Sequence, residues 1–334
     1  MANNQLSKIF EALKKSGYQI FGPKERDGEL HILELQSVPE AENLSRVPDS
    51  PASRTAEKPF GFVAPADAAG RPYKYFFTPI RETLYKYEKG KLNAPRVKEE
   101  KRAFFGMGLF DCKALELYDK VFEDDFYYQQ NRKNTFIIGY SSVPLEKIKT
   151  PFFEINLESA VFDIFIEKDK FFARSKKGEE ILKKCGIKYK LVKYVPHKPD
   201  KKVLAIKKAM EASAESKMWD ELGEICLACG KCTLACPTCF CFDFESKIGP
   251  ECQTERCTGN CFYDDFSRLA GGHKFLNNPK EKIRFWYYHK FVRLPKDYGL
   301  PGCVDCGRCT AVCPVGINIQ KNIERLLRET KKKK

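Results

Sequence analysis

The residues best suited to chemistry are cysteines that form two runs near the end of the 334-residue chain. Both runs have the spacing Cys-x-x-Cys-x-x-Cys-x-x-x-Cys-Pro. Their members are Cys226, Cys229, Cys232, Cys236 and Pro237 in the first, and Cys303, Cys306, Cys309, Cys313 and Pro314 in the second. This spacing lets three thiolates converge on one iron–sulfur cube while the backbone loops around it, and glycines at 230 and 307 permit the tight loop. The two runs therefore predict two [4Fe–4S] clusters.

The fourth cysteine of each run is expected to cross over, because in two-cluster ferredoxins it binds the cluster of the other run. The expected ligands of cluster 1 are Cys226, Cys229, Cys232 and Cys313. Those of cluster 2 are Cys303, Cys306, Cys309 and Cys236. Zinc is the weaker interpretation, since zinc sites use paired Cys-x-x-Cys knuckles without the third close cysteine and the Cys-Pro ending.

Five further cysteines lie between the runs, at positions 239, 241, 252, 257 and 261. Two interpretations stay open. The thiols either pack as small apolar groups, or several of them bind a third iron–sulfur cluster. In the second case the expected ligands are Cys239, Cys241, Cys257 and Cys261, because a Cys-x-Cys pair presents two sulfurs to one centre. His273 and His289 are conceivable ligands, but a structural role is the more common one for a histidine.

Composition narrows the class of protein. Of the 15 cysteines, only Cys112 and Cys185 lie outside residues 226–313, so the cysteines are concentrated in the segment that is expected to bind metal. The first residues lack the apolar core of a signal peptide and no apolar run is long enough to span a bilayer, so we expect a cytoplasmic protein in which disulfides do not persist. The formal charge of +14 overstates the positive charge, since iron-bound thiolates are negative.

Several functions lack a sequence signal. The lysines are interspersed with acidic residues, so nucleic-acid binding is a remote alternative. The chain has no Gly-x-Gly-x-x-Gly or Walker run, and no set of residues that indicates catalysis, so we expect neither a bound nucleotide nor a catalytic site.

The elements that must position the cysteines predict an α+β fold. Apolar periodicity indicates helices at 6–13, 112–122 and 176–185, and strands at 18–21, 31–35, 104–110, 135–140, 161–166 and 188–195. These form a mixed α/β domain over 1–198, with a long polar excursion at 39–72. One connecting helix is expected over 199–222. A helical ferredoxin-like dicluster domain is expected over 223–330, because 67 positions separate Cys236 from Cys303 and include a helix-like stretch at 280–292.

Longer stretches of sequence resemble a known family. They are CLACGKCTLACPTCFCFDF, CFYDDFSRLAGGHKF, YYHKF and GCVDCGRCTAVCPVGINI, with softer similarity in FFTPIRETLYKYE, FFGMGLFDCKALELYDKVF and NTFIIGY. The chain resembles the beta subunit of soluble archaeal sulfhydrogenases and the corresponding electron-transfer subunit of anaerobic sulfite reductase along nearly its whole length.

The resemblance implies an electron-transfer subunit of a soluble anaerobic complex. Such a subunit passes electrons between a flavin subunit linked to NAD(P)H or ferredoxin and a catalytic subunit. A component of a heterodisulfide-reductase-like or electron-bifurcating complex is the nearer alternative. In the family pattern Cys239, Cys241 and Cys261 match recurring cysteines, which favours the third centre. Family members also carry N-terminal cysteines, one of them before an aspartate that matches Asp111, where this chain has Phe110. The comparison implies that an N-terminal cluster has been lost.

Overall fold

The structure is a computed structural model that describes residues 2–26, 29–38, 72–94, 100–148, 150, 152, 156–196, 201–247, 249 and 252–332. The excursion predicted at 39–72 lies outside these residues, except for Pro72. Helices and mixed sheets build an α+β fold, which confirms the predicted fold class.

In the part of the chain described, the N-terminal half forms a seven-stranded sheet with the order β2-β1-β5-β6-β7-β8-β9. The strands are β1 (Gln19–Arg26), β2 (Glu29–Glu34), β5 (Arg102–Gly108), β6 (Thr135–Ser141), β7 (Ile164–Glu167), β8 (Lys170–Ala173) and β9 (Lys190–Leu191). The strands β1, β5, β6 and β7 run parallel, whereas β2 and β8 are antiparallel to their inner neighbours. The run expected as a strand at 188–195 shortens to two residues, because only Lys190 and Leu191 pair with β8.

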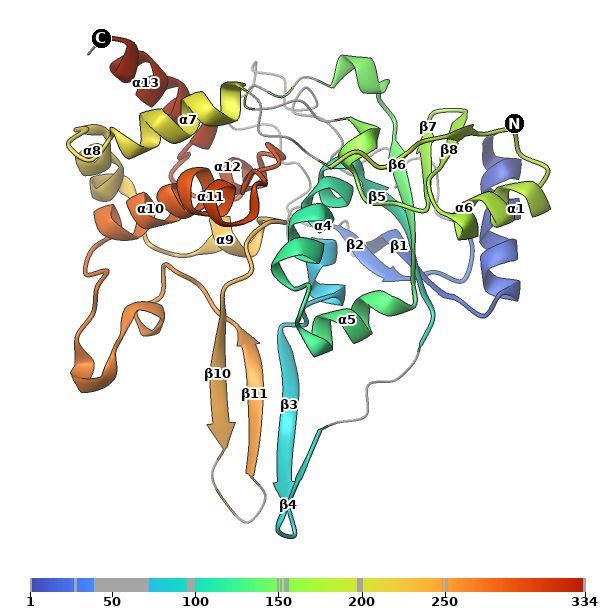
Figure 1. The fold of residues 1–334 in the computed structure, drawn as a ribbon, viewed down its shortest axis with the longest axis horizontal. Coiled ribbons are helices and arrows are strands. Elements are labelled where there is room, and N and C mark those ends of the chain that lie inside the picture. The colour runs from blue at the N-terminus through green and yellow to red at the C-terminus, as the bar shows by residue number, and fades with distance from the viewer. Residues whose placement is uncertain are drawn as a thin grey trace.

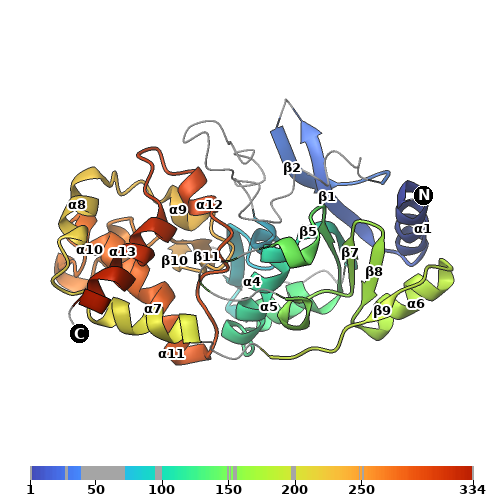
Figure 2. The same ribbon diagram turned by 90° about the horizontal axis from the view of Figure 1, so that it is seen from above.

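Helices cover both faces of this sheet (Figure 2). They are α1 (Ala2–Lys15) and α6 (Lys176–Lys184) on one face, and α4 (Leu109–Val121), followed by α5 (Phe126–Lys133), on the other. Side chains that alternate along β5 separate the two cores: Phe105 packs on Phe10 of α1, and Phe104 packs on Phe77 beside α4. The apolar core on the α4 side of the sheet continues into the cysteine-rich region.

A four-stranded antiparallel sheet, the β-arm, projects from the body (Figure 1). It consists of β10 (Phe242–Lys247), β11 (Cys252–Thr258), β3 (Arg81–Glu88) and β4 (Lys91–Asn93), in that order. The sequence analysis did not predict this sheet. It pairs β3, from the first predicted domain, with β11, which lies between the two cysteine runs.

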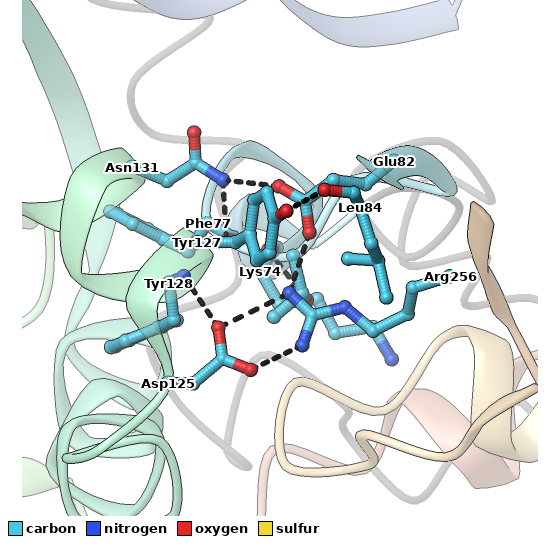
Figure 3. A network of polar contacts seen from close by, with 10 residues as sticks. Lys74, Phe77, Glu82, Leu84, Asp125, Tyr127, Tyr128, Asn131 and Arg256 are labelled. Carbon is cyan, nitrogen blue, oxygen red and sulfur yellow. Dashed lines mark hydrogen bonds and ion pairs between the residues drawn. The ribbon is translucent and has the colours of Figure 1, made fainter. Parts of the chain in front are cut away.

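Arg256 of β11 fastens the β-arm to the body (Figure 3). Its guanidinium lies 2.5 Å from Glu82 of β3 and 2.5 Å from Asp125, which caps the N-terminus of α5. Asn131 of α5 donates a second hydrogen bond to Glu82. Ion pairs and a hydrogen bond among β11, β3 and α5 therefore hold the base of the β-arm against the body.

The cysteine-rich region is mainly helical apart from β10 and β11. Its helices are α7 (Lys201–Glu211), α8 (Met218–Ile225), α9 (Lys231–Leu234), α10 (Pro279–Tyr288), the π-helix η7 (His289–Arg293), α11 (Leu294–Tyr298), α12 (Arg308–Ala311) and α13 (Ile319–Lys332). Short 3-10 turns complete the described structure: η2 (Tyr73–Phe76), η3 (Leu145–Lys147), η4 (Leu157–Ser159), η5 (Asp265–Ser267) and η6 (Ala270–Gly272). None of the described helices has both the length and the apolar character needed to cross a bilayer.

The single connecting helix expected over 199–222 is wrong, because α7 and α8 are separate helices. Serines interrupt the helix between them: the Ser213 hydroxyl donates to the carbonyl of Met210, and the Ser216 hydroxyl accepts a hydrogen bond from the Met218 amide. The indole of Trp219 donates to the Ser213 carbonyl and fixes the turn. One apolar core then runs from Phe104 of the sheet to Ile323 of α13.

Candidate iron–sulfur centre

The two cysteine runs fold into loops of the same shape. Ala228 and Asp305, two positions after the first cysteine of each run, both adopt positive φ angles, of 49° and 54°. Gly230 and Gly307 follow with φ angles of 72° and 66°, and each precedes a short helix. Left-handed conformations are costly for residues other than glycine and gather at functional sites. The shared strain indicates that both loops are built to wrap around the same kind of group.

The expected ligands of cluster 1 meet around one mainly apolar pocket. Cys226, Cys229, Cys232 and Cys313 all line it. Cys309, an expected ligand of cluster 2, also lines it, as do Leu227 and Val315 at its exposed edge and the buried Trp286 and Ile283. The Cys226 sulfur accepts a hydrogen bond from the Ala228 amide (3.4 Å), and the Cys313 sulfur accepts one from the Ile317 amide (3.3 Å). The fourth cysteine of the second run thus lies with the first three of the first run.

The expected ligands of cluster 2 are more buried than those of cluster 1: Cys236, Cys303 and Cys306 are buried, and Cys309 is partly buried. Cys303 lies close enough to Cys309 and Cys236 for their charges to raise the pKa of its thiol further, after burial has raised it. The Cys303 sulfur accepts a hydrogen bond from the Asp305 amide (3.3 Å), which repeats the contact seen in the first run. Thr238, two residues after Cys236, donates to the carbonyl of Gly302 (2.7 Å) and holds the two runs together.

Two buried lysines approach Cys236. The Lys290 ammonium donates to the Cys236 sulfur (3.1 Å), to the Thr238 hydroxyl (2.9 Å) and to the Gly302 carbonyl (2.9 Å). Burial would raise the pKa of Cys236, but a hydrogen bond with Cys239 and the charges of Lys290 and Lys74 bring it well below its ordinary value. Thiolate is the form that binds iron, so this environment suits a ligand.

The second lysine reaches the site from the N-terminal half. Lys74, in η2, donates to the carbonyls of Thr233 (3.3 Å), Cys236 (2.8 Å) and Cys239 (2.8 Å). It is almost fully buried, and the backbone oxygens around it replace the water that an ammonium group would otherwise keep. The end of the first run is therefore anchored to the first half of the chain.

Arg308 joins the second run to the N-terminal half of the chain, as Lys74 joins the first. Its guanidinium forms a two-pronged ion pair with Asp111 at the start of α4, and both side chains are buried. The aspartate that matches the family pattern thus supports the second cluster loop. The preceding Phe110 is packed in the apolar core.

The structure brings together three of the four cysteines expected at a third centre. Cys239 lies beside Cys236, and Cys241 lies beside Cys261. A hydrogen bond from the Cys261 thiol lowers the pKa of Cys241 to about 7, although burial opposes the shift. The charge of Cys239 also acts on Cys261, and Cys239 and Cys241 line one cavity, so the three thiols are neighbours.

Cys257 is placed less centrally. It lines the same cavity as Cys239 and Cys241, yet its thiol interacts with Arg81 and Glu245 on the β-arm. Cys252 lies farther along β11, opposite Tyr87, and its thiol donates to the Gly249 carbonyl (3.0 Å).

In the part of the chain that the structure describes, none of the remaining histidines and cysteines considered as ligands lies next to the two cysteine runs as a sulfur or nitrogen donor. The His289 ring packs between Phe240 and Phe285, and burial lowers its pKa to about 4. His273 is exposed in the loop that precedes α10. The Cys112 thiol is buried in the core and donates to the Met107 carbonyl.

The donor set fits an iron–sulfur cluster. Within the described ranges, no three His, Cys, Asp or Glu side chains form a group that could hold a single metal ion. In a four-iron cluster each thiolate binds its own iron, so the four sulfurs surround a volume and do not share one point. The cysteines around the apolar pocket have this arrangement.

Two cysteine loops of the same shape, with Cys313 at the pocket of the first run, are the arrangement that a dicluster iron–sulfur domain requires, and the comparison with protein families agrees. Residues 225–317 match the family described as a 4Fe-4S dicluster domain. The chain is also 29% identical over 278 residues to sulfhydrogenase 2 subunit beta from Pyrococcus furiosus, which covers 76% of this chain and 82% of that protein. This confirms the predicted resemblance to sulfhydrogenase beta subunits and supports an iron–sulfur electron-transfer subunit. No solved structure matches the chain.

The sequence analysis missed the polar residues that support the cysteines. Lys74, Lys290, Arg308 and Asp111 are all buried, which is rare for charged side chains without partners. The only sequence signal for Lys290 was its place between aromatic residues in YYHKF, where a lysine interrupts an apolar helical stretch.

Proposed function

We propose that this protein relays single electrons through two [4Fe–4S] clusters within a hetero-oligomeric oxidoreductase. One partner is a flavoprotein subunit linked to NAD(P)H or ferredoxin, and the other is a catalytic subunit of the hydrogenase or sulfite-reductase type. The observation that carries the proposal is that Cys313 lines the pocket of the first cysteine run, while the two runs form loops of the same shape. When bound, the clusters supply one-electron redox chemistry, and the chain supplies thiolates, hydrogen bonds to sulfur and a partly covered environment.

Two measurements test this function. Protein purified without oxygen is expected to contain about eight iron atoms and about eight labile sulfides per chain from the two clusters alone. Native mass spectrometry of the complex from the producing organism is expected to show a flavoprotein, and NAD(P)H or reduced ferredoxin is expected to reduce the clusters through that subunit. Zinc in place of iron would refute the cluster assignment. A heterodisulfide-reductase-type partner in the complex would replace the proposed catalytic subunit.

We further propose a third iron–sulfur centre held mainly by Cys239, Cys241, Cys257 and Cys261. Three of these thiols are neighbours, and the hydrogen bond from Cys261 lowers the pKa of the Cys241 thiol to about 7, which favours the thiolate form that binds iron. Replacing Cys239 and Cys241 together with serine is expected to lower the iron content by about four atoms, while the signals of clusters 1 and 2 persist.

The matched control is Cys252→Ser, since Cys252 lies away from the group on the β-arm. It is expected to leave the iron content unchanged. Unchanged iron in the double variant, with only reduced stability, would show that these thiols pack as small apolar groups. The single variant Cys257→Ser tests whether the cysteine beside Arg81 belongs to the set.

A further inference from the structure

Lys290 occupies a site built to bring an ammonium group against one sulfur. It lies in the π-helix η7, and π-helical turns are often found at functional sites. Its side chain is 2% exposed, and its three hydrogen bonds end on Cys236, Thr238 and Gly302.

The backbone at Gly302 packs closely against the backbone of Lys290. A Cβ atom at this position would lie 2.5 Å from the Lys290 carbonyl oxygen and 2.9 Å from the Lys290 Cα. Only glycine allows this approach of the second cysteine run to η7. The close contact brings the Gly302 carbonyl within hydrogen-bond distance of the Lys290 ammonium (2.9 Å). Cys303, the first cysteine of the second run, is the next residue in the chain.

Two other buried cations near cluster 2, Arg308 and Lys74, are directed at oxygen atoms. Arg308 is paired with Asp111, and Asp305 is a buried acid beside Cys303. The Lys74 ammonium is directed at carbonyl oxygens, among them those of Cys236 and Cys239. By contrast, the Lys290 ammonium donates one of its hydrogen bonds directly to the Cys236 sulfur (3.1 Å).

The two clusters differ in this respect. Cys313 is the counterpart of Cys236 in the second run, and its sulfur accepts a hydrogen bond from the neutral amide of Ile317 (3.3 Å). Cys236 receives a hydrogen bond from a cation at 3.1 Å. Hydrogen bonds to the sulfurs and net charge are among the main determinants of cluster potential.

We propose that Lys290 is a positioning residue that fixes the Cys236 thiolate and raises the reduction potential of cluster 2 relative to the value that its buried ligands alone would give. This inference rests on the proposed function. When bound by its four thiolates, cluster 2 would accept one electron from a one-electron donor in the complex. The net charge of the cluster with its ligands would go from two negative charges to three, with no covalent bond or proton exchanged. An adjacent positive charge stabilises the more negative state more strongly.

The test is a redox titration with dithionite, followed by electron paramagnetic resonance, on the full chain with both clusters loaded. Lys290→Met, which keeps length and removes charge, is expected to make reduction of cluster 2 at least tenfold less favourable, about 59 mV for a one-electron couple. Cluster 1 is the internal reference and is expected to keep its potential. Lys296→Met is the matched control, because this lysine is exposed on the adjacent helix α11 and its charge is screened by water.

Lys290→Arg is expected to retain most of the native potential, and Lys290→Gln to resemble the methionine variant. Equal potentials in the native protein and in a fully loaded Lys290→Met variant would overturn the inference. If neither neutral variant binds cluster 2, the lysine holds the cluster and does not set its potential, which also overturns it. In either case, reduction of both clusters in the native protein through the flavoprotein would leave the proposed function standing.

Discussion

Replacing Cys236 with alanine is expected to remove the cluster bound by the other cysteine run, with about four iron atoms lost. The reason is spatial: Thr238 and Lys290 both bind the Gly302 carbonyl, so the end of the first run lies against the start of the second. Iron analysis and electron paramagnetic resonance of anaerobic protein measure the loss. The signal that disappears is expected to be that of the cluster at Cys303, Cys306 and Cys309.

Cys313→Ala provides the reciprocal measurement. It is expected to remove the cluster at Cys226, Cys229 and Cys232, since Cys313 lines their pocket. Loss of the sequence-adjacent cluster in both variants would show that the fourth cysteines do not cross. Cys185→Ala serves as the control for a cysteine remote from both runs, because it packs against the sheet and α6.

Breaking the Arg308–Asp111 ion pair is expected to cost about 3–5 kcal/mol of the free energy of unfolding. Arg308→Leu leaves the Asp111 carboxylate buried at 3% exposure without its guanidinium partner. Anaerobic urea denaturation, compared by midpoint and slope, measures the change. The effect is expected to extend to cluster 2, since Arg308 directly precedes Cys309.

Two further variants isolate the cause. Arg325→Leu removes an arginine from the surface pair with Glu221 and is expected to cost less than about 1 kcal/mol. The double variant Arg308→Leu with Asp111→Leu is expected to recover much of the loss, because the penalty comes mainly from the unpaired buried charge. A loss for Arg308→Leu as small as that for Arg325→Leu would contradict the assignment.

The parts of the structure that local sequence encodes were predictable. The periodicity of Leu6, Ile9 and Leu13 predicted a helix where α1 lies, and the apolar run at 135–140 became β6. The spacing of each cysteine run implied the loop that the structure shows, because three ligands within seven residues leave the backbone little choice.

The parts set by distant contacts were not predictable in the same way. Lys74 reaches Cys236 across 162 positions, and Arg308 reaches Asp111 across 197, so neither contact leaves a local pattern. The strands of the β-arm alternate aromatic and charged residues, as in Phe242, Phe244 and Lys247, but cysteines in the same stretch drew the interpretation toward metal binding. The break between α7 and α8 depends on the Trp219 indole, whose partner lies across the turn.

The pairing of β3 with β11 has a consequence for how the protein is made. Arg81 and Glu255 are 174 positions apart, and at translation rates of about 5–20 residues per second β3 leaves the ribosome roughly 9 to 35 seconds before its partner strand exists. During this interval β3 is an open strand edge, and its charged residues, among them Lys86 and Glu88, protect it from pairing with another chain. The nascent protein must therefore keep one edge of β3 unpaired until β11 has been synthesised, and β11 follows the first cysteine run.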